Sequence, residues 1–185
     1  ANTSLNARIT SGKIDVMSLT GNIIDISSVS GNVVIMDVKG QCTARSTSGK
    51  VSISKIVGDV RAESLSSAVS VSNVIGTTKF LAGSGTVTGA NLIGKVLAKS
   101  GSASIKLVSV KGDIEIRTAS GFSEIDDVEG KIDITTASGS VVVEKIKGYL
   151  DCETASGDIK GLDITLVEGA DLSTISGSIS VQLIN

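Results

Sequence analysis

The chain has 185 residues, a net charge of −2 and an aliphatic composition: 41% of its residues are hydrophobic, 2% are aromatic, and Trp, Pro and His are absent. Without histidine, Ser-His and Cys-His nucleophile pairs and imidazole-ligated metal sites are excluded. No apolar run approaches the roughly 18 residues of a membrane span. Lys and Arg form no cluster of the kind that binds nucleic acid, so neither membrane insertion by this segment nor nucleic-acid binding is expected.

Residues 1–11 show little periodicity and are expected to form an irregular lead-in or a first coil. From residue 31 onward, small residues recur every 18 positions: Gly31, Gly49, Ser67, Gly85, Ala103, Gly121, Gly139 and Gly157. A second column, half a unit later, keeps the same interval: Gly40, Gly58, Gly76, Gly94, Gly112, Gly130 and Gly148. The repeat is therefore a pair of nine-residue half-units, and regular coils are expected over about residues 12–181.

The interval is longer at both ends of the repeat. Gly12 lies 19 residues before Gly31, and Gly177 lies 20 residues after Gly157. These insertions of one and two residues predict bulges or loosened turns.

Within each half-unit, apolar residues recur two, four and seven places after the glycine. Alternation with a period of two over short β-branched runs predicts strands, and the longer step of three predicts a corner. No window carries a helical period. Val143 and Ile134 are two of the positions expected to point inward, where an Asp would unfold the domain.

A unit of 18 residues cannot bury its own apolar side, so neighbouring units must stack and share one core. Stacking in register places equivalent residues about 4.8 Å apart. We therefore predict that residues 1–185 form one all-β domain, a right-handed parallel β-helix (β-solenoid) of about nine coils.

Residues 110–121, VKGDIEIRTASG, show the repeated motif in full. The motif runs from about Gly12 to Val181 and resembles the putative-adhesin family of prokaryotic β-solenoid domains. That resemblance implies a solenoid fold and an association with the cell envelope, and it brings no catalytic motif.

Cys42 and Cys152 occupy inward columns of the second half-unit. They lie six coils apart, which is about 29 Å at about 4.8 Å per coil. A disulfide needs Cα atoms within about 7 Å, so we expect two buried free thiols.

An acidic ladder stands three places after successive glycines and consists of Glu115, Asp133 and Asp151, with Asp171 continuing it if the last insertion is absorbed at a corner. Carboxylates stacked about 4.8 Å apart repel unless Lys, Arg or a cation compensates them. Lys131 and Arg117 flank the ladder. We favour a solvated column, with a weak divalent-cation site as the alternative, and expect no other metal site and no cofactor.

Ser and Thr fill two columns beside the first small-residue column, where hydroxyls usually satisfy backbone groups at corners. Every coil between Gly31 and Gly157 has 18 residues, which leaves no long loop to build a catalytic groove. Only two aromatic residues, Phe122 and Tyr149, are expected to point outward. Catalysis is therefore not expected.

The sequence favours a non-catalytic structural or interaction module, adhesin-like, of a cell-surface or envelope-associated protein. Its location would be the cell envelope or outside the cell, and its partner a protein or glycan at the cell surface. One alternative is a self-assembling scaffold joined end to end, and a weaker one is a degenerate polysaccharide-active β-helix.

Charge is unevenly distributed along the chain. Residues 1–92 carry 8 basic and 5 acidic side chains, and residues 93–185 carry 9 and 14. Together with apolar terminal strands, this predicts weak end-on self-association that is stronger at low salt.

Overall fold

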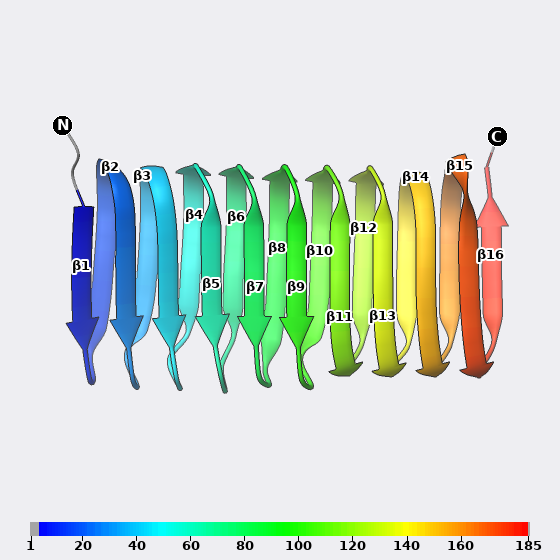
Figure 1. Cartoon of the computed structure of the whole chain (residues 1–185), viewed down its shortest axis with the longest axis horizontal. Coiled ribbons are helices and arrows are strands. Elements are labelled where there is room, and N and C mark those ends of the chain that lie inside the picture. The colour runs from blue at the N-terminus through cyan, green and yellow to red at the C-terminus, as the bar shows by residue number, and fades with distance from the viewer. Residues whose placement is uncertain (1–3, 185) are drawn as a thin grey trace.

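The computed structural model describes residues 4–184, which form β-strands joined by short turns and contain no helix. They build a single parallel β-solenoid of about ten turns of about 18 residues, which confirms the predicted fold class with about one turn more than expected. Figure 1 shows a straight rod in which successive turns lie side by side from one end to the other. Over the same residues, no helix exists that is long and apolar enough to cross a membrane.

The strands, in chain order, are β1 (Ser4–Ile9), β2 (Lys13–Ser28), β3 (Asn32–Ser46), β4 (Val51–Val57), β5 (Val60–Ser64), β6 (Val69–Ile75), β7 (Thr78–Ala82), β8 (Thr86–Ile93), β9 (Val96–Ser100), β10 (Ser104–Lys111), β11 (Ile114–Ser120), β12 (Ser123–Glu129), β13 (Ile132–Ser138), β14 (Val141–Ser156), β15 (Ile159–Ser176) and β16 (Ile179–Leu183).

The strands form two rows that run in opposite directions in Figure 1. The first row contains β4, β6, β8, β10 and β12, and the second row contains β5, β7, β9, β11 and β13. The longer strands β2, β3, β14 and β15 turn the corner and pair with strands of both rows or with one another. Neighbours pair in parallel with a register of 18 residues, as in Val51 with Val69 and Val69 with Val87.

The two ends of the described chain continue this pattern. Strand β1 pairs in parallel with Ile23–Ser28 of β2, so residues from Ser4 onward belong to a coil and are not an irregular lead-in. Residues 1–3, the rest of that expected lead-in, lie outside the described residues. Strand β16 pairs with β15 at the other end.

Both predicted insertions are register shifts at corners. One falls in β2, where Thr20 pairs with Lys39 but Ile23 pairs with Gln41. The other falls in β15, where Leu166 pairs with Gly148 but Gly169 pairs with Tyr149. The side chains beyond each shift return to the common register.

The inward side chains form one continuous aliphatic core along the rod. Val143 and Ile134 are 0% and 1% exposed, as predicted. The largest fully buried side chain is that of Phe80, in a column that otherwise holds alanine beside it, Ala62 and Ala98. Gly89 makes room for it, because a Cβ atom at Gly89 would lie 3.2 Å from the Phe80 ring and 2.6 Å from Leu107.

Two kinds of positive-φ residue turn the corners. The second glycine column, represented by Gly130 at φ 151°, packs so tightly that an added Cβ would lie 2.5 Å from the carbonyl oxygen of Gly112. The step of three residues in the first half-unit contains a left-handed residue that is not glycine, at φ of 52–57°: Ser18, Asp37, Lys55, Asn73, Asn91, Ser109, Asp127, Lys145 and Asp163. That conformation explains the predicted corner.

Candidate functional site

The outward side of the second row carries two stacked columns of side chains. Because side chains alternate along a strand, residues two apart point to the same side. The outer column runs through Asp25, Thr43, Arg61, Lys79, Leu97, Glu115, Asp133, Asp151 and Asp171. The groove column lies two residues further along each strand and runs through Ser27, Arg45, Glu63, Leu81, Lys99, Arg117, Thr135, Glu153 and Ser173.

The predicted acidic ladder forms part of the outer column. Glu115, Asp133 and Asp151 are aligned on successive turns, and Asp171 continues them past the insertion. Only the first of these carboxylates has ion-pair partners among the described residues. Residues 4–184 contain no group of three or more His, Cys, Asp or Glu side chains arranged to hold a metal ion.

Glu115 is compensated by cations on both sides. Its Oε1 atom lies 3.0 Å from Arg117 Nε, and its Oε2 atom lies 3.8 Å from Lys95 Nζ. The hydrogen bond from Arg117 lowers the pKa of Glu115, with burial opposing it weakly. Arg117 therefore takes the flanking role predicted for it, whereas Lys131 places its Nζ atom 4.9 Å from the centre of the Tyr149 ring.

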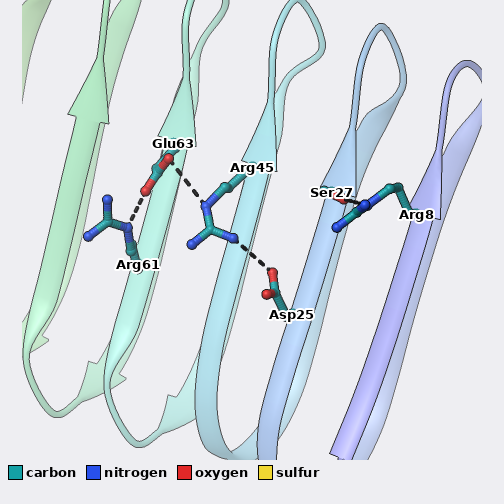
Figure 2. Close-up of polar contacts among 6 residues, drawn as sticks. All are labelled: Arg8, Asp25, Ser27, Arg45, Arg61 and Glu63. Carbon is teal, nitrogen blue, oxygen red and sulfur yellow. Dashed lines mark hydrogen bonds and ion pairs between the residues drawn. The ribbon is translucent and has the colours of Figure 1, made fainter.

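The basic end of the face is crossed by a chain of ion pairs, which Figure 2 shows in close-up. Arg45 bridges two turns, with Nη1 at 3.0 Å from Asp25 Oδ1 and Nε at 3.4 Å from Glu63 Oε2. Arg61 also contacts Glu63 from the same strand. Exposed pairs contribute about 0–1 kcal/mol each, so this chain orients the side chains more than it stabilises the fold.

A shallow groove of about 1060 Å³ follows the edge of this face along the rod. One wall is the groove column, and the opposite wall is a column of mostly small residues: Thr47, Leu65, Gly83, Gly101, Ala119 and Ala137. The groove exists because side chains on this second wall are short while those on the first are long. The sequence analysis missed it, although the run of Gly and Ala at one register was a usable signal.

The floor of the groove is the Ser and Thr column: Ser28, Ser46, Ser64, Ala82, Ser100, Thr118 and Thr136. Its hydroxyls turn inward. Ser46 Oγ accepts a hydrogen bond from Gly49 N at 2.9 Å and donates to Gly31 O at 3.2 Å. Thr118 Oγ1 donates to Ser120 O at 2.9 Å. The predicted role of this column in satisfying corner backbone is confirmed at these residues, which leaves the walls to contact a ligand.

The cationic part of the groove lies where β9 meets β11. Lys99 and Arg117 are paired in register on these strands and both are exposed. Lys99 has no ion-pair partner within the described part of the chain, whereas Arg117 is held by Glu115. One uncompensated positive charge therefore faces the groove next to a second, anchored one.

Both cysteines are buried and free, as predicted. Burial raises the pKa of Cys42 to about 11 and that of Cys152 to about 12, the latter also because of Asp151 and Asp133. A thiol is a nucleophile only as the thiolate, so neither cysteine is suited to catalysis near neutral pH.

Comparisons with known proteins agree with this architecture. The model of one family, described as Toastrack DUF4097, matches residues 2–185. No curated protein and no solved structure matched the chain. The family match carries the solenoid fold, while adhesin activity is not part of it. Because the family model covers almost the whole sequence, the chain belongs to the Toastrack DUF4097 family.

Proposed function

We propose that the domain is a non-catalytic, adhesin-like interaction module of an envelope-associated or cell-surface protein, and that it binds an extended anionic segment of its partner in the groove. The observation that carries this proposal is the groove of about 1060 Å³ along the second row, with cationic side chains on one wall.

The shape of the groove favours a long ligand over a compact one. Its lining follows the groove column from Ser27 to Thr135, one residue per turn. At about 4.8 Å per turn this is about 29 Å, the length of roughly nine residues of extended peptide. A ligand of that kind would meet the same wall geometry on each turn.

The charge of the long wall favours anionic groups on the ligand. Arg45, Lys99 and Arg117 line it against a single carboxylate, that of Glu63. Arg45 is already bridged to Asp25 and Glu63, so the cations free to act on a ligand are concentrated at β9 and β11. Complementary charge of this kind speeds association and sets the position of the ligand.

Two observations support a role in binding without catalysis. The acidic ladder lies on the flat outer column, and none of its members lines the groove. The outward aromatic residues, Phe122 and Tyr149, do not line it either, so the groove has no ring to stack against a sugar. Recognition would rely on anionic groups of an acidic peptide or an acidic glycan.

The test is a binding titration with two fluorescent probes, polyglutamate and a polyuronate. Lys99→Glu with Arg117→Glu is expected to weaken binding of the preferred probe at least tenfold, and Ala119→Leu with Ala137→Leu to block the groove without a change of charge. The control, Lys55→Glu with Lys111→Glu, changes the same charge on the first row. No binding of either probe, or equal loss in the control, would overturn the proposal.

End-on self-association remains a second proposal. Strand β16 pairs only with β15 among the described strands, and its Ile179 and Leu183 side chains are 44% and 57% exposed. Sedimentation at low and at physiological ionic strength tests it, because the oppositely charged halves should associate more strongly at low salt. A species that stays monomeric in both buffers would contradict it.

A further inference from the structure

We propose that the outward face of the second row pairs with the same face of a second copy of the chain, with the two rods antiparallel. The proposal rests on the order of charges along the outer column and is independent of the groove ligand. That column is basic on β5 and β7, apolar on β9 and acidic on β11 and β13.

The outer column leaves like charges stacked and uncompensated. Arg61 and Lys79 are neighbours in register, as are Asp133 and Asp151. In the described part of the chain, Lys79, Asp133 and Asp151 have no ion-pair partner. Like charges on adjacent strands disfavour each other, and a surface of opposite order would relieve both segments at once.

A two-fold axis supplies such a surface. In an interface with two-fold symmetry the same patch of both copies meets itself, so residue i contacts residue j and j contacts i. With the axis crossing the rods at β9, Leu97 meets Leu97 of the second copy. Lys79 then lies opposite Glu115, and Arg61 lies opposite Asp133. Parallel rods would instead place like charges face to face.

The groove column obeys the same symmetry. Arg45, three turns before Lys99, falls opposite Glu153, three turns after it. Leu81 falls opposite Arg117, whose aliphatic stem it can contact. The partly buried Leu81 and Leu97 give the interface an apolar centre with charged flanks. Lys99 alone meets a like charge, its own copy.

Charge reversal tests the pairing by sedimentation equilibrium at low salt. The variant Arg61→Glu with Lys79→Glu makes the column acidic, and Glu115→Lys with Asp133→Lys makes it basic. We expect a dimer for the unmodified chain, monomers for each variant, and a heterodimer in their equimolar mixture. A monomeric unmodified chain, or a mixture that stays monomeric while both variants remain folded by circular dichroism, would overturn the proposal.

Two further variants separate this pairing from the other proposals. Leu97→Cys should form a disulfide between two copies under mild oxidation, while Val108→Cys on the first row should not, and the buried native cysteines do not interfere. Lys99→Gln should tighten the dimer severalfold although it weakens binding in the groove. Equal crosslinking at both cysteine positions, or a weaker dimer with Lys99→Gln, would contradict the antiparallel arrangement.

Discussion

Alternate residues of the second row follow different rules. Inward side chains such as Ile114, Ile132 and Leu150 stay aliphatic from turn to turn and are at most 1% exposed. Outward side chains on the same strands change from basic to apolar to acidic along the rod. Packing limits the first set, because interiors are close-packed and felt to a single methylene. The second set is free to vary, so binding properties can change there without loss of the fold.

The sharpest way to break this comparison is to place one charge on each side of a strand. Ile134→Asp should unfold the domain, as should Val143→Asp, because a buried unpaired carboxylate costs several kcal/mol. Thr135→Asp, one residue away and pointing outward, should change the free energy of unfolding by less than about 0.5 kcal/mol. Urea denaturation measures both. A cooperatively folded Ile134→Asp variant would mean that the inward and outward assignments are reversed.

The corners test a second requirement of the core, the close approach of successive turns. Gly130→Ala should destabilise by about 2–3 kcal/mol, because the new Cβ would lie 2.5 Å from Gly112 O at a φ of 151°. Gly169→Ala serves as the matched control, since its φ is 128° but nothing lies within 4 Å. A smaller loss there isolates the cost of the contact. Equal losses at both sites would show that φ alone matters.

A third substitution should improve the core. Thr78 Oγ1 is buried without a hydrogen-bond partner, in a column that otherwise holds Val60 and Val96. Thr78→Val keeps the shape and removes the unsatisfied hydroxyl, so it should stabilise by about 1 kcal/mol. Thr88→Val, on an outward position of β8, should have little effect. If Thr78→Val destabilises the domain, the hydroxyl has a partner in solution.

The smallest effect is expected at the acidic ladder. Arg117 lowers the pKa of Glu115, so this pair adds stability above the ordinary pKa of the carboxyl and loses it as the pH falls through the lowered value. The pair is solvent-exposed, so Glu115→Gln should cost less than about 0.5 kcal/mol. Millimolar calcium should raise the melting temperature only slightly. A rise of many degrees that Glu115→Gln with Asp133→Asn abolishes would establish a cation site.

The inward columns were predictable because each repeats one residue type at one register. Val143, Ile134 and the two cysteines all lie where the period of two places them. The bulges followed from the altered glycine spacing, and Asp171 returned to register as expected. What repeats in the sequence could therefore be read as structure.

The groove and the left-handed corner residues were not predicted. The groove depends on a difference in side-chain length between two columns, and neither column looks unusual when read alone. Nine corner residues adopt positive φ without being glycine, and only Asn73 and Asn91 belong to the type most tolerant of that conformation. The partner of Lys131 was wrong for a similar reason, since Tyr149 belongs to the next turn and to another column.

The central claim, that inward columns make the fold and the outward face makes the contacts, is tested most directly by one paired measurement. Lys99→Glu with Arg117→Glu is examined for its melting temperature and for its affinity to the anionic probe that the unmodified domain prefers. We predict a melting temperature within about 2 °C of the original, since exposed charges add little stability, together with at least tenfold weaker binding. Unchanged affinity in a variant with an unchanged melting temperature would contradict the claim.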